Sequence, residues 1–314
     1  MPTILITGGT GLIGKTLTPM LLEKGYRVII LTRKITTGSM PEGVSYALWD
    51  LHKKTIDLSA LQEADYIIHL AGAGVVEKKW TKAYQQEIIN SRVNSSALLI
   101  EQLTRHSNSV KAMISTSAIG WYGPDKIPDG RERPFTESDP ADHSFLGATC
   151  RLWEESVAPI TALGKRLVIL RTGIVLSQQG GALVEFKKPI QFGIAGILGS
   201  GKQMVSWIHI TDLCRLFIYA LEENIHGVYN AVAPVPVNNK TLTLQLARKM
   251  RGRFFIPMHI PAFVLKLMMG ERSIEVLKST TVSSIKIKDQ GFVFLYPSIE
   301  SALAELFNTT DQHE

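Results

Sequence analysis

The sequence predicts an α/β protein: a doubly wound parallel sheet with helices on both faces, followed by a smaller mixed C-terminal unit. The main observation is that apolar segments of strand length alternate with amphipathic segments of helix length through the first two-thirds of the 314 residues. A glycine-rich turn, Thr7–Gly14, joins the first strand to the first helix. The alternation becomes irregular after about Gly173, which indicates a second unit.

The alternating part contains five expected strands and three expected helices. The strands are Thr3–Thr7, Arg27–Thr32, Tyr66–Ala71, Lys111–Ser117 and Arg166–Thr172. The helices are Leu12–Lys24, Lys82–Arg105 and Ala148–Leu163. Pro19 lies inside the first helix and lacks a backbone donor, so we expect a local distortion there. Strict alternation of this kind favours parallel strands covered on both faces.

Six glycines between residues 178 and 201 predict loops around a cleft. The elements expected beyond them are a strand at Ser206–Ile210, a helix at Asp212–Glu223 with Thr211 as its N-cap, a strand at Val228–Ala231, and helices at Leu242–Arg251 and Ser298–Phe307. We see no low-complexity linker. We therefore expect residues 1–175 with 203–232 to form a nucleotide-binding domain, and residues 176–202 with 233–314 a smaller substrate domain.

Composition limits the class of protein. With 45% hydrophobic and 20% charged residues, the chain can bury a substantial core, and disorder is excluded as its main state. Cys150 and Cys214 are too few for a disulfide framework and lack metal-ligand spacing, so we expect a reducing compartment, the cytoplasm, and no metal. No apolar run approaches ~20 residues, and no basic leader precedes Thr3, so we expect neither a membrane partner nor a signal peptide.

The basic residues show no pattern typical of nucleic-acid binding. The formal charge is +6 and the pI about 9.2, but lysine pairs such as Lys53–Lys54 and Lys78–Lys79 lie in mixed segments without interleaved aromatic residues. A solvated surface explains them, and a positive charge also suits a phosphorylated small ligand. We expect a small-molecule substrate, no nucleic acid, and a monomer or homodimer.

The turn Thr7–Gly14 is the strongest signal. Gly9, Gly11 and Gly14 satisfy the G-x-G-x-x-G pattern directly after a strand and before a helix, which is typical of a Rossmann dinucleotide site. Glycine permits a tight turn and a close approach to pyrophosphate, and the helix amides face the phosphate charge. The alternative is a βα turn without a ligand. The residues expected to contact the cofactor here are Gly8, Thr10, Gly11, Leu12 and Ile13.

The end of the second strand favours NADP(H) over NAD. An NAD site usually has a carboxylate about 20 residues beyond the glycines, bound to the ribose hydroxyls. Here that position holds Thr32 and Arg33, followed by Lys34, without an acid. An acid would repel a 2′-phosphate, whereas a guanidinium can bind one through two hydrogen bonds. The alternative is a pair of solvated basic residues.

Four motifs in order resemble the extended short-chain dehydrogenases, the NAD(P)-dependent epimerase/dehydratase group. They are Thr7–Gly14, Asp65–Gly72, Ser115–Gly123 and Trp207–Asp212. Trp80-Thr81, Asn90-Ser91-Arg92, Trp153-Glu154 and the tail from about Met258 resemble an atypical subgroup, usually called epimerase family protein, some members of which are labelled as candidate cell-division inhibitors. The resemblance covers nearly the whole chain.

The resemblance also implies further cofactor contacts. They come from the end of the third strand, from the long helix and from beyond the fifth strand: Leu70, Ala71, Gly72, Glu87, Arg92 and Val175, the last near the nicotinamide. Trp49-Asp50 resembles the adenine-side loop. For Glu87 and Arg92 the alternative is a solvated helical face, since residues five apart make a poor intrahelical pair.

The usual catalytic pair of this group is missing. Typical members use a Ser or Thr with Tyr-x-x-x-Lys, in which the lysine lowers the tyrosine pKa for proton transfer. Ser117 fits the serine, but Leu146 and Cys150 occupy the other two positions and cannot perform that chemistry. Candidate replacements, each of which also has a purely structural interpretation, are Tyr122, Glu137 and His209.

Two functions are compatible with these patterns. The first is an NADP(H)-dependent oxidoreductase or epimerase-like enzyme acting on a small polar substrate, with Ser117 and Tyr122 as catalytic candidates. In it, the segment Gly180–Gly201 would form a mobile lid and Arg171 would hold an anionic group. The second is a non-catalytic NADPH-binding regulatory or scaffold protein, which the missing pair favours.

Overall fold

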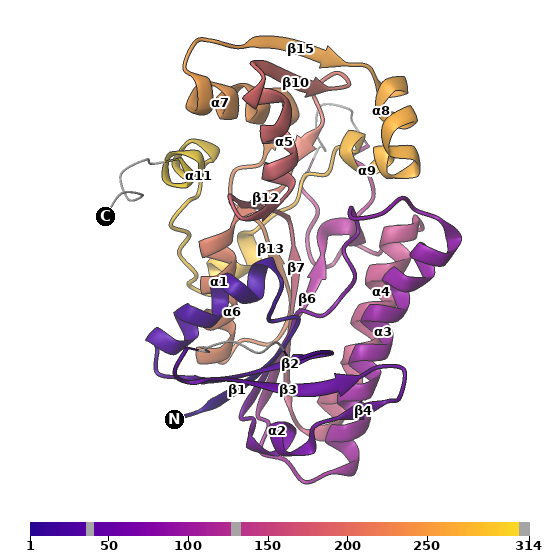
Figure 1. The fold of residues 1–314 in the computed structure, drawn as a ribbon, viewed down its shortest axis with the longest axis vertical. Helices are drawn as coiled ribbons and strands as arrows, with labels where there is room; N and C mark the ends of the chain where they lie inside the picture. The colour runs from indigo at the N-terminus through magenta and orange to yellow at the C-terminus, as the bar shows by residue number, and fades with distance from the viewer. Residues whose placement is uncertain (36–40, 127–132, 308–314) are drawn as a thin grey trace.

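The larger part of the molecule is built around an eight-stranded sheet (Figure 1). The computed structural model describes residues 1–35, 41–126 and 133–307. The strand order is β13-β7-β6-β5-β1-β2-β3-β4, and all neighbours pair in parallel except β3 and β4. The strands are β1 (Thr3–Thr7), β2 (Arg27–Thr32), β3 (Val44–Asp50), β4 (Thr55–Ile56), β5 (Tyr66–His69), β6 (Ala112–Ala118), β7 (Arg166–Thr172) and β13 (Gly227–Ala231).

Helices cover both faces of this sheet, which confirms the predicted doubly wound α/β fold. One face packs against α1 (Leu12–Glu23), α6 (Ile210–Glu222) and α10 (Ile285–Asp289); the other packs against α2 (Leu58–Glu63), α3 (Lys82–Arg105), α4 (Phe145–Val157) and the 3-10 turn Ala158–Leu163. Alternation within the strands produces the two cores, since Ile4 and Ile6 lie in the first and Leu5 in the second. Another 3-10 turn, Ile119–Trp121, follows β6.

The topology places the carboxyl ends of β1 and β5 beside each other. Thr7 pairs in register with His69, and His69 with Ser115 of β6. Strands β2 and β3 extend the sheet on one side of β1, whereas β5, β6 and β7 extend it on the other. Open α/β sheets bind ligands at such a switch point, at the carboxyl edge.

The rest of the chain forms three small sheets and several helices above this edge in Figure 1. The strands are β8 (Ile174–Ser177), β9 (Gly180–Gly181), β10 (Ile194–Leu198), β11 (Met204–Val205), β12 (Trp207–His209), β14 (Val237–Asn238) and β15 (Ile256–Ile260). The helices are α5 (Ala182–Gln191), α7 (Asn239–Arg251), α8 (Ala262–Met269), α9 (Ser273–Leu277) and α11 (Ile299–Leu306), with a 3-10 turn at Gly270–Arg272. A core that includes Leu183, Leu242 and Leu303 joins α5, α7 and α11.

Three local predictions were wrong. The glycine-rich segment forms α5 and β10 instead of only loops, because Gly181 and Gly193 lie at the ends of these elements and Gly196 is accommodated within β10. The helix predicted from Asp212 begins at Ile210, and the His209 ring, rather than Thr211, caps it by accepting the Thr211 amide at 3.2 Å. Trp49 and Asp50 end strand β3 instead of forming a loop.

The C-terminal tail returns to the first sheet. The buried carboxylate of Asp212 on α6 accepts hydrogen bonds from the amides of Leu295 and Tyr296, at 2.9 and 2.8 Å. Ile287 and Phe292 belong to the core between the sheet, α1 and α6. Among the described helices, none combines the length and apolar character needed to span a bilayer.

Candidate functional site

The turn between β1 and α1 is packed so tightly that three glycines are required. Gly8 adopts φ +69°, and a Cβ on it would lie 2.9 Å from the carbonyl carbon of Leu70. A Cβ on Gly14 would lie 2.4 Å from Gly9 Cα, and one on Gly9 would lie 2.9 Å from the Ile30 side chain. The turn therefore packs directly against the loop after β5, against β2 and against its own helix.

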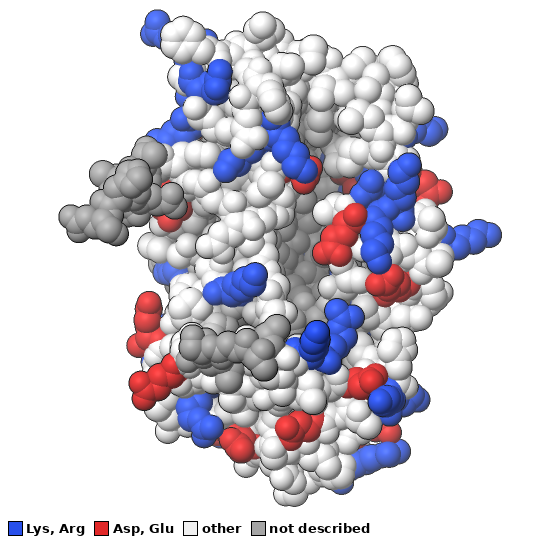
Figure 2. All heavy atoms as spheres, viewed as in Figure 1, with Lys and Arg blue, Asp and Glu red and all other residues white. Residues whose placement is uncertain are grey.

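The first turn of α1 is open to a ligand. Gly11 is the N-cap, and no side chain caps the helix or places an acid in its first turn. Thr10 and Gly11 are exposed, whereas Leu12 and Ile13 pack partly into the core. Amides at such an end are available to an anion and face it with the positive end of the helix dipole. Figure 2 shows that the surface is hollowed between the α1 side of the molecule and the α3 side.

The end of β2 is basic. Arg33 and Lys34 are exposed, and the Thr32 hydroxyl donates to the Lys34 carbonyl at 2.9 Å. Within the described part of the chain, Arg33 makes no salt bridge and no acid lies at this strand end. The guanidinium is thus available to an anionic ligand.

A buried hydrogen-bond chain starts at Thr7, the last residue of β1. Its Oγ1 accepts from the amides of Leu70 and Ala71, at 3.2 and 3.1 Å. Because both lone pairs are used, the hydroxyl donates to His69 Nδ1, 2.7 Å away, and the His69 hydrogen lies on Nε2. Burial, with a smaller contribution from Arg92, lowers the pKa of His69 from 6.5 to about 4. The ring is therefore neutral at pH 7.

The same chain continues onto α3. His69 Nε2 donates to the hydroxyls of Ser96 and Ser95, at 3.1 and 3.3 Å. Both serines donate in turn to the backbone carbonyl of Arg92 at 2.9 Å. The end of β1, the end of β5 and the middle of α3 are thereby held at fixed positions.

Arg92 on α3 binds the backbone of the loop that follows β5. Its guanidinium donates to the carbonyls of Ala73 and Ile88, at 3.0 and 2.9 Å, and lies 4.8 Å from the centre of the Trp153 ring. A Cβ on Gly72 would lie 3.0 Å from Arg92 Cζ, so the guanidinium packs closely against this glycine. The structure therefore shows Arg92 positioning the backbone of residues 72 and 73.

The other residues implied by the resemblance lie apart from this chain. Glu87 is exposed, 3.8 Å from the Lys78 ammonium, as on a solvated helical face. Val175 lies in β8, partly buried and in register with Ile208 of β12. Leu70 is half-buried, Ala71 is buried and Gly72 is exposed at the carboxyl edge.

Ser117, near the end of β6, belongs to a buried polar network. Its hydroxyl donates to Glu154 Oε1 at 2.7 Å. The Arg171 guanidinium binds the same carboxylate through two hydrogen bonds, Nε to Oε1 at 2.8 Å and Nη2 to Oε2 at 2.9 Å. Because its hydrogen points to Glu154, Ser117 presents only lone pairs to a ligand. The prediction that Arg171 holds an anionic substrate group was wrong, because Arg171 is buried and neutralised by Glu154.

Tyr122 joins this network from the far side. Its hydroxyl donates to Asn230 Oδ1 at 2.7 Å and accepts from Arg171 at 3.0 Å. The ring has no exposed surface, and burial raises the pKa of Tyr122 to about 12, although Arg171 acts in the opposite direction. The structure thus links the two predicted catalytic residues through Glu154 and Arg171, with Tyr122 sealed from solvent.

Apolar packing fills the positions of the usual catalytic pair. Cys150 is buried, and burial raises the pKa of its thiol to about 11. Leu146 and Cys150 both lie within 3.6 Å of the Cβ position of Gly120. Neither side chain can move a proton at pH 7.

The other two candidate proton donors have structural partners. Glu137 Oε1 accepts a hydrogen bond from the backbone amide of Asn230 at 2.8 Å. The buried His209 ring donates from Nε2 to Glu305 at 2.8 Å, and its Nδ1 accepts an amide hydrogen. Among residues 1–35, 41–126 and 133–307, no group of three or more His, Cys, Asp or Glu side chains is suited to a metal ion.

Sequence reasoning did not assign a role to three side chains of these buried networks: Thr7, His69 and Glu154. Thr7 and His69 each end a buried strand where an apolar residue is usual, and that position was a usable signal. Glu154 was noted only as part of the motif Trp153-Glu154, and its place in a helix did not indicate its pairing with Arg171.

Comparison with known proteins agrees with a nucleotide-binding site at this edge of the sheet. Residues 4–231 match the model of the NAD dependent epimerase/dehydratase family. The chain belongs to this family. Residues 260–306 match a second model, a domain of unknown function named DUF1731, which is the C-terminal extension. An epimerase family protein of Staphylococcus saprophyticus is 35% identical over 312 residues, covering 98% of this chain and 99% of the relative. One of Staphylococcus aureus is 34% identical over 309 residues, with 98% and 100% covered.

Solved structures extend this similarity. The human epimerase family protein SDR39U1, solved with NADPH, has a TM-score of 0.83 and 28% identity, covering 98% of this chain and 99% of that one. A nucleoside-diphosphate sugar epimerase of Corynebacterium glutamicum has a TM-score of 0.76 and 31% identity, covering 98% of this chain and 59% of that one. The predicted family, fold class and C-terminal extension are confirmed, and the protein is an epimerase-like member of an NAD(P)-binding family.

Proposed function

We propose that the protein binds NADP(H) and uses it to convert a small polar substrate at the carboxyl edge of β1, β5 and β6. The supporting observation is that the uncapped first turn of α1 and Arg33 lie at one edge of the sheet; among the described residues, Arg33 has no salt bridge and no acid lies at the end of β2. Residues 1–175 with 203–232 would hold the cofactor, and the remaining segments would cover the substrate.

The residues at the edge fit the parts of a dinucleotide. The amides of Gly11, Leu12 and Ile13 would bind the diphosphate, with Gly8 and Thr10 allowing its approach. Arg33 and Thr32 would bind a 2′-phosphate, and the human relative solved with NADPH supports this choice. The loop Leu70–Gly72 would line the ribose, with Val175 toward the nicotinamide, which supplies or accepts a hydride when bound.

Ser117 would bind a substrate hydroxyl. Because its own hydrogen is committed to Glu154, Ser117 Oγ can accept a hydrogen bond from an alcohol but cannot donate one to a carbonyl. A proton leaving the alcohol would pass to Ser117 while the serine hydrogen passes to Glu154. Two hydrogen bonds from Arg171 would hold the Glu154 carboxylate in place for this transfer.

A second candidate is a non-catalytic NADPH-binding regulatory or scaffold protein. The observation that favours it is that Leu146, Cys150 and Tyr122 provide no titratable group open to the site. Such a protein would use the cofactor to stabilise one conformation for a partner.

Calorimetric titration with NADPH and with NADH tests the cofactor assignment. Arg33→Asp replaces attraction to a 2′-phosphate by repulsion, so we expect NADPH affinity to fall about 100-fold and NADH affinity to change less than about threefold. Arg27→Asp, the same charge change at the opposite end of β2, is the matched control. Equal losses for both nucleotides would contradict the role of Arg33.

Turnover distinguishes the two candidates. The absorbance of reduced nicotinamide is followed with a panel of alcohols and carbonyl compounds, using the wild type and Ser117→Ala. Turnover that Ser117→Ala abolishes, with NADPH affinity kept, supports the enzyme. Tight NADPH binding without turnover across the panel supports the regulatory protein.

A further inference from the structure

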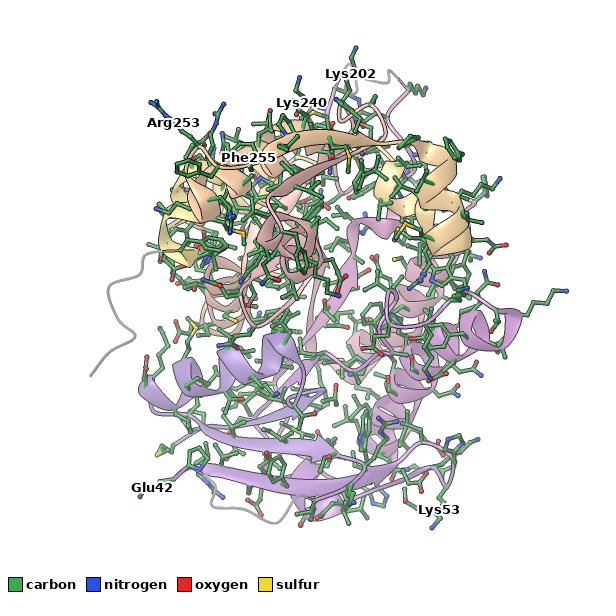
Figure 3. All side chains as sticks on the ribbon, turned by 45° about the horizontal axis from the view of Figure 1, so that its top comes forward. Glu42, Lys53, Lys202, Lys240, Arg253 and Phe255 are labelled. Carbon is green, nitrogen blue, oxygen red and sulfur yellow. The ribbon has the colours of Figure 1, made fainter. Side chains whose placement is uncertain are left out.

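The end of the molecule that contains α7, β15 and α8 is strongly basic. Residues 239–280 contain eight Lys or Arg and two Glu residues, a net charge of +6 that equals that of all 314 residues. Glu275 is paired with Lys278 at 2.8 Å, and Glu271 accepts from Gln85 at 3.2 Å. In Figure 3, Lys202, Lys240 and Arg253 extend from this end, which β15 crosses. The exposed basic side chains of the segment are Lys240, Arg248, Lys249, Arg251, Arg253 and Lys266.

The same end exposes large apolar side chains, which we call the apolar ridge: Phe254 (83% exposed), Ile256 (72%), Phe263 (73%), Leu267 (84%) and Met268 (67%). They come from β15, the residue pair before it, and α8. Seven of the eight residues of α8 are apolar, yet only Leu265 is buried. A helix that is apolar on all sides normally lies inside a core or against a partner, and a ridge this exposed indicates an interaction surface.

Strand addition at β15 is disfavoured. The Ile256 amide points toward β10, where it donates to the Gly193 carbonyl at 2.8 Å. Because successive residues of a strand alternate in direction, Pro257 faces the open edge, where it has no N–H to offer. An added strand would therefore lack a donor near the start of β15.

A second copy of the chain is also disfavoured. In a two-fold symmetric contact the same patch meets itself, so this end would bring its +6 charge against another +6. The favoured partner is apolar at its core and anionic at its surface. That combination is the chemistry of a bilayer containing acidic phospholipids.

We propose that the end formed by α7, β15 and α8 docks on an anionic lipid surface. The apolar ridge enters at head-group depth, and the surrounding Lys and Arg side chains face the lipid phosphates. This does not depend on the proposed cofactor or reaction. It revises the sequence-based expectation of no membrane partner, which rested on the absence of a membrane-spanning apolar run; docking on a lipid surface needs no such run.

The test is co-sedimentation of the full chain with vesicles of phosphatidylcholine alone or with added phosphatidylglycerol. We expect binding only with phosphatidylglycerol, decreasing as salt rises. Replacing Arg251 and Arg253 together by Glu removes two attractions worth about fivefold each, so we expect at least about a 25-fold loss. Replacing Phe263 and Leu267 together by Ser should weaken binding about tenfold or more per side chain.

The controls are matched changes at exposed positions elsewhere. Lys53→Glu changes a basic residue at the opposite end of the molecule (Figure 3), and Leu48→Ser removes a side chain that is 49% exposed on β3. We expect neither to affect vesicle binding, and all variants to keep the wild-type unfolding midpoint. Equal binding to both vesicle types, no binding to either, loss in the control variants, or a concentration-dependent dimer that Phe263→Ser dissociates would each overturn the proposal.

Discussion

The hydroxyl of Thr7 connects the end of β1 to the loop after β5, and Thr7→Val tests whether this connection holds the candidate site together. Valine keeps the shape but removes the acceptor of the Ala71 amide and the donor to His69 Nδ1. The Leu70 amide keeps its second bond, to the Thr7 carbonyl at 3.1 Å. Thr7 is fully buried, so solvent does not replace the lost partners.

The expected magnitude follows from these two groups. A buried polar group left without its partner costs about 1–3 kcal/mol, so the free energy of unfolding should fall by about 3 kcal/mol. Thr7→Ser keeps the hydroxyl and loses one methyl group, and we expect a loss of about 1 kcal/mol. Thr18→Val is the control, because the buried Thr18 hydroxyl donates only within α1, to the Gly14 carbonyl at 2.8 Å. We expect this variant to lose less than about 1 kcal/mol of unfolding free energy.

Urea unfolding followed by circular dichroism measures these differences, and NADPH titration measures the effect on the loop Leu70–Gly72. Thr7→Val should weaken NADPH binding because the loop is released, whereas Thr18→Val should not. If Thr7→Val and Thr18→Val have the same stability within about 1 kcal/mol, the hydrogen-bond chain does not contribute as the geometry indicates.

Three further predictions concern buried ionisable groups. The pKa of His69 is about 4 in the folded protein and near 6.5 in the unfolded chain, so the unfolded state binds a proton first as the pH falls. The free energy of unfolding should therefore fall by about 3 kcal/mol between pH 6.5 and pH 4. His69→Gln should remove this dependence on pH. Glu154→Gln leaves the Arg171 charge buried and should cost about 3–4 kcal/mol in urea unfolding, whereas Glu155→Gln, which breaks an exposed pair, should cost less than about 0.5 kcal/mol. The thiol of Cys150, with its pKa raised to about 11, should react with a chromogenic disulfide only after unfolding, and rapid labelling of the native protein would contradict its burial.

The fold could be predicted where burial leaves a plain pattern. Strands β1, β2 and β7 have the predicted bounds because nearly every residue in them is apolar or buried. Strand β3 was missed because it lies near the sheet edge and only Ala47 and Trp49 are buried, so its pattern resembles a loop. Helix α5 was missed because glycine density was taken for irregular structure, when glycines such as Gly181 mark the ends of short elements.

The site could be predicted where it is local in sequence. The glycine turn and Arg33 lie within one βαβ unit, so their spacing sufficed. Arg171 could not be understood alone, because its partner Glu154 reaches it only when α4 packs on β6 and β7. Ser117 could be assigned to the serine position from the sequence, but the direction of its hydrogen bond to Glu154 could not.

The attachment of the C-terminal tail affects how this chain can be divided. The first family model ends at residue 231 and the second begins at residue 260, which suggests a natural place to cut the chain between them. A break there would deprive the Asp212 carboxylate of the two amides it binds and would uncover the side of α6 that Phe292 shields. A chimera that exchanges the extension must therefore keep both the backbone path that brings two amides to Asp212 and the apolar packing against α6.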